Sequence, residues 1–310
     1  MKKISIVTPV CNEEENIADI VQSIRDIMQE YNSLVYEHIF IDNSSTDKTV
    51  NFLREICLKD KNVKVIINRR NFGYLRSTFY AIKQSTGDSV ILISADLQDP
   101  PYLIKDFISH WLEGKKIILG KKKSSDEGYL LTLIKKFFYR FMQKISESQL
   151  TKDTVGFGLF DKEVIDSLKK IIDPYPYFRG LITEIGHEIF LVEYSQPIRK
   201  KGKSKFNFLS MYDIAITGIV KHSKLPIRIF TISGFILSLI SLLIALIYFV
   251  YKLVNWHTFS GGIAPILIGM FIIASFQIFF LGLIGEYILS IHTQVRNIPL
   301  VFEKERINFN

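Results

Sequence analysis

Three short segments of the sequence combine carboxylates, amides and hydroxyls, and each follows a run of β-branched residues. The segments are residues 9–13 (Pro-Val-Cys-Asn-Glu), 42–47 (Asp-Asn-Ser-Ser-Thr-Asp) and 94–101 (Ser-Ala-Asp-Leu-Gln-Asp-Pro-Pro). Carboxylate oxygens that gather at one place can hold Mg²⁺ or Mn²⁺, and such an ion neutralises the charge of a diphosphate. The residue types therefore indicate a site for a divalent cation and a diphosphate.

Helix capping is the alternative explanation for each segment taken alone. Ser45, Asp47 and Asp99 are good cap residues, because a side-chain oxygen can accept hydrogen bonds from the free amides of a first helical turn. Capping explains any one loop as well as ligand binding does. Three such loops at one edge of a sheet favour a binding site.

The elements that position these segments alternate between short β-rich runs and helical patterns. Strands are expected at residues 4–10, 38–41, 63–67, 89–93 and 116–119, and helices at 14–30, 46–59, 75–84 and 102–112. This alternation predicts right-handed crossovers and an α/β, Rossmann-like fold with a mostly parallel sheet. In such sheets ligands bind at the carboxyl ends of the strands, which is where the three polar segments begin.

Charge and hydropathy are unevenly distributed along the 310 residues. The chain has a net charge of +8 and is 48% hydrophobic, with a mean hydropathy of +0.19. Eight Lys or Arg residues lie between Arg199 and Arg228, where Asp213 is the single acid. A basic block directly before the most apolar part of a chain is typical of a membrane anchor with its positive side in the cytoplasm. This pattern argues against a nucleic acid as the main partner.

Two uncharged stretches follow the basic block, at residues 229–251 and 261–285. Each is long enough to cross a hydrocarbon core of about 30 Å as a helix. Together they predict a two-helix transmembrane hairpin with both ends in the cytoplasm. Residues 207–222 have the spacing of an amphipathic helix on the bilayer surface.

The predicted organisation therefore has four parts. They are a cytoplasmic catalytic domain (1–206), an interfacial juxtamembrane segment (207–226), the membrane hairpin (227–290) and a cytoplasmic tail (291–310). The start of the chain predicts a first strand rather than a signal peptide, since its apolar run is short and ends at acidic residues. The two cysteines, Cys11 and Cys57, suit buried, reduced thiols. The expected location is the inner membrane, multi-pass, with both termini in the cytoplasm.

Five motifs occur in a fixed order along the chain. They are Pro9-x-x-Asn12-Glu13, Asp42-Asn43-Ser44-Ser45-x-Asp47-x-Thr49, Arg70-Asn71-Phe72-Gly73, Asp96-Leu97-Gln98-Asp99-Pro100-Pro101 and Arg199-x-x-Gly202-x-Ser204-Lys205. With the two-helix anchor, this order resembles the polyprenyl-phosphate glycosyltransferases. Those are family 2 enzymes of the GT-A fold, similar to dolichyl-phosphate mannose synthase and the bacterial undecaprenyl-phosphate glucosyltransferases. The resemblance covers nearly the whole chain.

The resemblance implies transfer of a sugar from a nucleotide diphosphate sugar, expected to be a UDP-sugar, to a polyprenyl phosphate, with inversion at the anomeric carbon. Neither tryptophan lies in the Gln-x-x-Arg-Trp motif of processive synthases, so one sugar per turnover is expected. The predicted partners are the nucleotide sugar, the lipid phosphate and the membrane. Small residues in the two spans, such as Gly234 and Gly282, offer surfaces through which copies can associate into a homo-oligomer.

The resemblance also assigns roles to individual residues. Pro9, Glu13 and Asp42 would hold the nucleobase and ribose, and Ser94 and Ala95 would complete the nucleotide site. Asp96 is the predicted catalytic and metal-binding acid, with Gln98 as a second ligand of Mg²⁺ or Mn²⁺. Arg199 and Lys205 would reach the diphosphate, as Arg and Lys commonly do, and Arg199 is also a predicted catalytic residue. A lipid-attracting collar is an equally good explanation for the whole basic block.

Two departures from the family pattern concern the reaction itself. Ser94 stands where the family usually has the first Asp of Asp-x-Asp, and Gly156 stands at the position often assigned to the catalytic base. A sugar hydroxyl needs such a base, but a phosphate monoester, with a second pKa of about 6, is already an anion at neutral pH. A phosphate acceptor therefore removes the need for the missing acid. Asp99, Asp153 and Asp161 remain as nearby carboxylates.

Another basic stretch, residues 121–144, has lysines and arginines beside aromatic and aliphatic residues. It suits a helix on lipid headgroups that guides a lipid phosphate, or equally an ordinary solvated helix. Two other functions stay open. One is a non-catalytic homologue that scaffolds a lipid-linked glycan pathway, and the other is transfer to a sugar hydroxyl of a lipid-linked saccharide.

Overall fold

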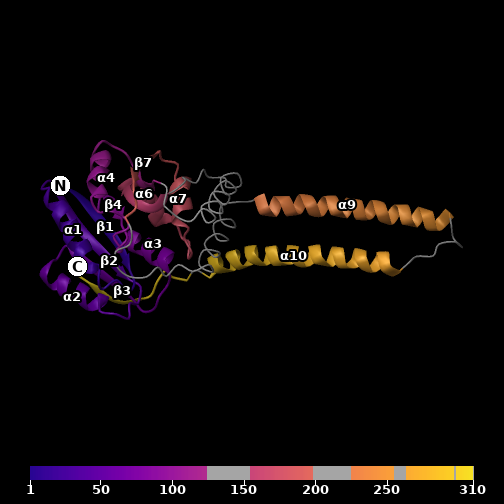
Figure 1. Cartoon of the computed structure of the whole chain (residues 1–310), viewed down its shortest axis with the longest axis horizontal. Coiled ribbons are helices and arrows are strands. Elements are labelled where there is room, and N and C mark those ends of the chain that lie inside the picture. The colour runs from indigo at the N-terminus through magenta and orange to yellow at the C-terminus, as the bar shows by residue number, and fades with distance from the viewer. Residues whose placement is uncertain (124–153, 198–224, 255–262, 297, 310) are drawn as a thin grey trace.

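The computed structural model describes residues 1–123, 154–197, 225–254, 263–296 and 298–309 (Figure 1). Arg199, Lys205, Asp153, the predicted interfacial helix and most of the basic stretch 121–144 lie outside the described residues. The strands are β1 (Lys2–Val10), β2 (Leu34–Asp42), β3 (Val63–Asn68), β4 (Ser89–Leu92), β5 (Ile117–Lys122), β6 (Thr154–Asp161), β7 (Ile189–Tyr194) and β8 (Glu303–Ile307). The helices are α1 (Ile17–Gln29), α2 (Thr49–Lys59), α3 (Tyr74–Gln84), α4 (Leu103–Leu112), α6 (Lys162–Lys170), α7 (Phe178–Glu184), α9 (Leu225–Val254) and α10 (Ile263–Val295).

The described strands form one sheet in the order β7-β5-β6-β4-β1-β2-β3-β8. The central strands β4, β1, β2 and β3 are parallel, which confirms the predicted crossovers for this half. Strand β5 runs in the same direction as β4 but is not its neighbour. Instead β6 lies between them and is antiparallel to both, while β7 pairs parallel to β5. The sequence does not predict β6 or β7, and the periodicity that locates β1 to β5 does not specify which of these strands are neighbours.

Helices cover both faces of the sheet, as the long apolar strands require. Buried side chains of α1, α2 and α4, such as Ile20, Leu53 and Phe107, pack on one face. Side chains of α3, α6 and α7 pack on the other, among them Phe79 and Leu181. Burial on both faces leaves the two ends of the strands as the places where polar chemistry can occur.

Two long helices extend from the same side of this domain (Figure 1). Helix α9 has 30 residues and α10 has 33, so each is roughly 45 to 50 Å long. Within the described part of the chain, one stretch, Ile272–Val295, is long and apolar enough to cross a membrane, and Thr231–Ile240 is a shorter apolar stretch. The predicted span at residues 229–251 is therefore not confirmed by length and composition, while the candidate in α10 overlaps the predicted span at 261–285.

The chain returns to the sheet after α10. Strand β8 pairs antiparallel with β3, from Val65 opposite Ile307 to Asn68 opposite Glu303. No strand is predicted in this region from the sequence, because the charged segment 303–306 lacks the alternation of a half-buried strand. The predicted tail therefore contributes an edge strand to the domain that begins the chain.

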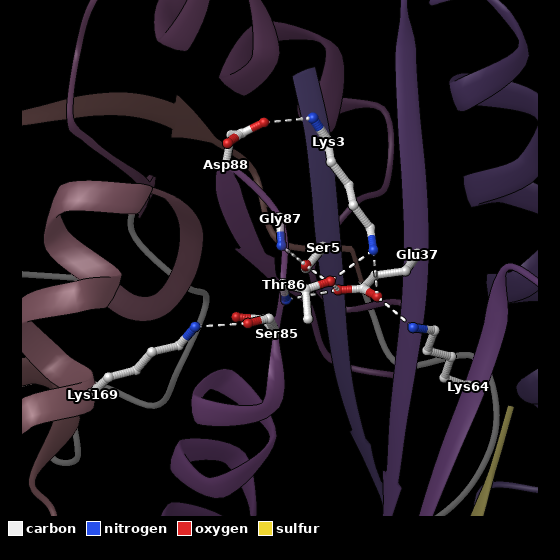
Figure 2. Close-up of polar contacts among 9 residues, drawn as sticks. All are labelled: Lys3, Ser5, Glu37, Lys64, Ser85, Thr86, Gly87, Asp88 and Lys169. Atoms are coloured by element: carbon white, nitrogen blue, oxygen red, sulfur yellow. Dashed lines mark hydrogen bonds and ion pairs between the residues drawn. The ribbon is translucent and has the colours of Figure 1, made fainter. Parts of the chain in front are cut away.

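The amino ends of the strands hold a buried carboxylate, Glu37 of β2 (Figure 2). Lys3 and Lys64 approach Glu37 Oε2 at 2.9 and 2.8 Å. Ser5 Oγ donates to Oε1 at 2.6 Å, and the backbone amide and the hydroxyl of Thr86 both donate at 2.9 Å. Burial alone would raise the pKa of Glu37, but these bonds outweigh it and lower the pKa from 4.5 to about 2. The Glu37 carboxylate, which has hydrogen-bond or ion-pair partners at both oxygens, therefore stabilises this end of the sheet.

Candidate active site

The predicted polar segments meet at the opposite end of the sheet. Val10 and Asp42 are paired at the ends of β1 and β2, and Val7 is paired with Leu92 at the end of β4. Asn12 N donates to Ser45 Oγ at 2.8 Å, and Thr46 N donates to Asn12 Oδ1 at 2.7 Å. The first two loops are thus joined directly, and the third leaves from the strand on the other side of β1.

Each of the three loops contains a residue in the left-handed region of backbone space. These are Asn12 (φ 55°), Ser44 (φ 63°) and Leu97 (φ 57°). This conformation is uncommon for residues other than glycine and is strained for a branched side chain such as leucine. Backbone strain of this kind gathers at functional sites, where the surrounding structure maintains it.

Capping accounts for only part of these polar residues. Asp47 Oδ1 accepts from the amide of Thr49, the first residue of α2, at 3.0 Å. Asp99 instead accepts from Ser94 N at 3.2 Å, and the N-cap of α4 is Tyr102, which makes no side-chain cap bond. Asp47 therefore satisfies one free amide of the first turn of α2, although the N-cap itself is Lys48, whereas Asp99 stabilises its own loop.

Asp42 combines complete burial with an unsatisfied oxygen. Its exposed fraction is 0%, and Ser45 N donates to its Oδ2 at 3.0 Å. Among the described residues, Oδ1 has no hydrogen-bond partner. Burial raises the pKa of this carboxyl against the opposing hydrogen bonds from Ser45. A buried acceptor without a partner is costly, and a hydroxyl or N–H donor of a ligand would satisfy it.

The loop after β2 is fixed by an amide network that sequence reasoning did not assign. Asn43 Oδ1 accepts from Phe72 N at 2.8 Å, Ser77 Oγ at 3.0 Å and Asn68 Nδ2 at 3.2 Å. Asn43 Nδ2 donates to Asn71 Oδ1 at 2.8 Å. The third motif, Arg70-Asn71-Phe72-Gly73, is thus bonded to the residue beside Asp42. In the sequence, Asn43 can be singled out because it belongs to the second motif, whereas no motif includes Asn68 or Ser77.

The predicted donor-side residues lie together around these loops. Pro9 is half-buried near the end of β1, and Glu13 is half-buried after it. Glu13 N donates to Thr49 Oγ1 at 2.9 Å, and its carboxylate accepts from Asn16 at 2.7 Å. The structure therefore brings Pro9, Glu13 and Asp42 to the ends of two paired strands.

The loop after β4 contains the predicted metal residues. Ser94, Asp96 and Gln98 are half-buried, while Ala95 and Asp99 are buried. Gln98 N donates to Asp96 Oδ1 at 3.2 Å. Tyr194 of β7 donates to Asp99 Oδ1 at 3.2 Å, and burial raises the pKa of Asp99. Asp99 thus ties the loop to a strand at the far side of the sheet.

This loop supplies few ligands for a divalent cation, so water and phosphate oxygens would have to complete the coordination. The described residues contain no group of three or more His, Cys, Asp or Glu side chains placed to hold a metal. Mg²⁺ in phosphate sites keeps several waters and needs only one or two carboxylates plus phosphate oxygens. The oxygen donors of Asp96 and Gln98 suit that kind of site, in which the ligand completes the coordination.

Strand β6 has glycine at positions 156 and 158, the first of which is the position expected for a catalytic base. Gly156 has φ +90°, and a Cβ at Gly158 would lie 2.2 Å from Ile118 O. A side chain at Gly156 would be strained, and one at Gly158 would collide with the neighbouring strand. Both positions therefore favour glycine, and a carboxylate at position 156 would require a strained backbone.

Comparison with known proteins identifies the family. The model of glycosyl transferase family 2 matches residues 5–169. A prophage-derived bactoprenol glucosyl transferase of Shigella flexneri is 31% identical over 96% of this chain and 96% of its own length. A glycosyltransferase of Bacillus subtilis, described as uncharacterised, is 31% identical over 96% of this chain and 91% of its own.

A solved structure supports the fold. The glucosyl-3-phosphoglycerate synthase of Mycobacterium tuberculosis, crystallised with Mn²⁺, UDP and phosphoglyceric acid, superposes with a TM-score of 0.51 at 20% identity. The superposition covers 71% of this chain and 76% of that one. The sheet and its helices thus form a GT-A fold. On the sequence matches, the chain belongs to glycosyl transferase family 2 and is a glycosyltransferase.

Proposed function

We propose that this glycosyltransferase moves one sugar from a UDP-sugar to a polyprenyl phosphate at the cytoplasmic leaflet, with inversion. The observation that carries the proposal is that α10, the candidate membrane span, leads into β8 of the sheet that holds the candidate site. Relatives named for acting on bactoprenol match along nearly the whole chain. A membrane-bound acceptor suits both findings.

The donor would bind across the ends of β1 and β2. Asp42 Oδ1, which has no hydrogen-bond partner among the described residues, would accept from a ribose hydroxyl or a base N–H, with Pro9 and Glu13 nearby. Asp96 and Gln98 would hold Mg²⁺ or Mn²⁺, which supplies charge neutralisation for the departing diphosphate. Arg199 and Lys205 are proposed to add positive charge to the same leaving group.

The acceptor would react without a protein base. A phosphate monoester is an anionic nucleophile at neutral pH, which agrees with glycine at the family's base position. A single in-line displacement by this phosphate oxygen breaks the bond between the anomeric carbon and the diphosphate, and it inverts the anomeric carbon. Catalysis would then depend on position and on leaving-group stabilisation.

The proposed topology has both helices in the membrane. Strands β3 and β8 belong to one sheet, so the chain between them must cross a bilayer an even number of times. If Ile272–Val295 crosses, a second crossing is required before it, and α9 supplies 30 residues for that purpose. The basic block 199–228 supports a cytoplasmic catalytic domain.

The test is a transfer assay with the full-length protein in lipid vesicles. The vesicles contain undecaprenyl phosphate, and the assay adds Mn²⁺ or Mg²⁺ and a panel of labelled nucleotide sugars. The expected product is labelled sugar in the organic extract with at least one UDP-sugar. Absence of such product with every donor would overturn the proposal.

A scaffold function is the second candidate, because Ser94 and Gly156 depart from the family pattern. Asp96→Ala separates the two candidates: an enzyme loses turnover, while a scaffold keeps its partners and its phenotype. Product found only with a preformed lipid-linked saccharide would instead favour transfer to a sugar hydroxyl.

A further inference from the structure

The segment that follows α10 is bonded to the catalytic domain from Pro299 to Asn308. Arg69 N donates to Phe302 O at 2.9 Å, and Arg69 Nε donates to Glu303 O at 3.1 Å. Val301 is 4% exposed. At the far end of β8, Asn308 Nδ2 donates to the carbonyls of Cys57 and Val63, both at 2.9 Å. The exit from the candidate membrane helix is therefore held at a defined place on the domain.

Arg76 of α3 is the buried charge at the start of this segment. It is 7% exposed and donates through Nε to Leu300 O at 2.8 Å and through Nη2 to Pro299 O at 2.9 Å. A third nitrogen, Nη1, donates to Tyr175 Oη at 3.3 Å. Buried arginines normally pair with carboxylates, whereas the described bonds of Arg76 go to two backbone carbonyls and a phenol.

The same arginine contacts the donor side of the site. Its guanidinium lies 5.3 Å from the ring centre of Phe72, and that ring lies 6.1 Å from the ring of Phe302. Phe72 N in turn donates to Asn43 Oδ1, beside Asp42. A continuous set of contacts thus runs from Pro299 and Leu300, which follow α10, through Arg76 and Phe72, to the loop that carries the unsatisfied carboxylate.

We propose that Arg76 is a positioning residue that links the segment after α10 to the donor loops. This link would fix the distance of the donor site from the bilayer, so that the phosphate of a membrane-held acceptor reaches the bound donor. This inference rests on the proposed function. An acceptor that is fixed by the membrane cannot adjust to a displaced site, and an error of about 1 Å in the reacting geometry can cost about 100-fold in rate. A small acceptor free in solution can adjust its position.

Arg76→Gln in the full-length protein tests this role through two acceptors. Undecaprenyl phosphate in vesicles is compared with a short-chain polyprenyl phosphate in detergent, and UDP binding is measured by titration calorimetry. Transfer to the vesicle acceptor should fall by at least about tenfold, while UDP affinity and short-chain transfer change less than about twofold. Arg76→Lys, which can still donate to one carbonyl, should restore part of the vesicle rate.

Arg54→Gln is the matched control, because Arg54 pairs with Glu305 at an exposed position farther along β8. It should leave both rates unchanged. A second variant inserts two glycines after Asn297, which lengthens the link to α10 without altering Arg76. It should show the same selective loss of vesicle transfer, and it decides the question if Arg76→Gln fails to fold.

Three outcomes are informative. Equal rates for the wild type and the insertion variant in vesicles would overturn the positioning role, and so would an equal loss with both acceptors. If the wild type itself transfers no sugar to either acceptor, the proposed function fails, and the role of Arg76 fails with it for that separate reason.

Discussion

Strand β2 carries two buried carboxylates, one toward its amino end and one at its carboxyl end, and the two have opposite environments. Glu37 at the amino end accepts hydrogen bonds and ion pairs from Lys3, Lys64, Ser5 and Thr86, which lower its pKa to about 2. Asp42 at the carboxyl end has a raised pKa and, among the described residues, an oxygen without a partner. A carboxylate with all its partners stabilises the fold, and one that lacks a partner is available for a ligand.

Removing Glu37 should produce the largest loss of stability. Glu37→Ala leaves Lys3 and Lys64 beside a buried gap, and removing one partner of a buried ion pair costs about 3 kcal/mol or more. For a chain of this size the melting temperature should fall by roughly 5 to 10 °C, as measured by thermal unfolding in detergent. UDP affinity of the folded protein should not change. A shift below about 2 °C would contradict the stabilising role, and Glu113→Ala at an exposed ion pair is the control.

His38, next to Glu37, should make stability depend on pH. It is 1% exposed, its Nε2 lies 2.9 Å from Thr8 Oγ1, and burial lowers its pKa from 6.5 to about 3. The unfolded chain therefore binds a proton that the folded chain excludes. This contribution is fully present above pH 6.5 and is lost as pH falls toward 3.

The expected loss between pH 7 and 4.5 is about 2 to 3 kcal/mol. Glu37 contributes little to this window, because its pKa shift acts below 4.5. Thermal unfolding of the wild type and of His38→Gln at both pH values measures the effect. The variant should lose much less stability than the wild type, and parallel losses would show that another group is responsible.

Asp42→Asn should affect binding rather than folding. A hydrogen bond to a charged group contributes about 1.5 to 3 kcal/mol, so UDP should bind about 10- to 100-fold more weakly. Because the folded protein disfavours the charged form of Asp42, the neutral amide should leave stability equal or slightly higher. Calorimetric titration and thermal unfolding test both statements. If Asp42→Asn binds UDP normally but is less stable, Asp42 stabilises the fold and does not bind the donor.

Gly156→Asp should have the smallest effect on the transfer reaction, although it restores the residue type common in the family. The positive φ of Gly156 strains any side chain by about 1 to 2 kcal/mol, and a phosphate acceptor needs no base. Transfer should not increase, while the melting temperature falls by more than the few degrees expected for Gly156→Ala, because the carboxylate would be buried beside Leu92 and Phe178. A tenfold rise in transfer specific to the aspartate would show that a base does limit the reaction.

The sequence predicts the donor half of the molecule well because the evidence there is local. Apolar runs and helical spacing locate β1 to β4 and α1 to α4, and the rule for parallel sheets then places Asp42 and Asp96 at one edge. Family resemblance adds the motifs. Apolar runs, helical spacing and motifs can each be recognised within one short segment, without knowledge of the rest of the fold.

The rest depends on pairing between distant segments, which a single sequence does not encode locally. Strand β6 pairs with β4 and β5, and Glu303–Ile307 pairs with β3. Both pairings join segments that are far apart in the sequence. Likewise Arg76 is an ordinary helical residue in the sequence, and its buried bonds to Pro299 and Leu300 exist only in the folded chain. The role of Glu37 is hidden for the same reason.

The central claim is that the carboxyl end of the sheet performs sugar transfer to a lipid phosphate, while the amino end only stabilises the fold. The most direct measurement compares lipid-linked product per folded molecule for the wild type, Asp96→Asn and Glu37→Gln in the same vesicles with the same UDP-sugar. We predict at least about a 100-fold loss for Asp96→Asn and a rate within about twofold of wild type for Glu37→Gln. Wild-type turnover by Asp96→Asn would contradict the claim.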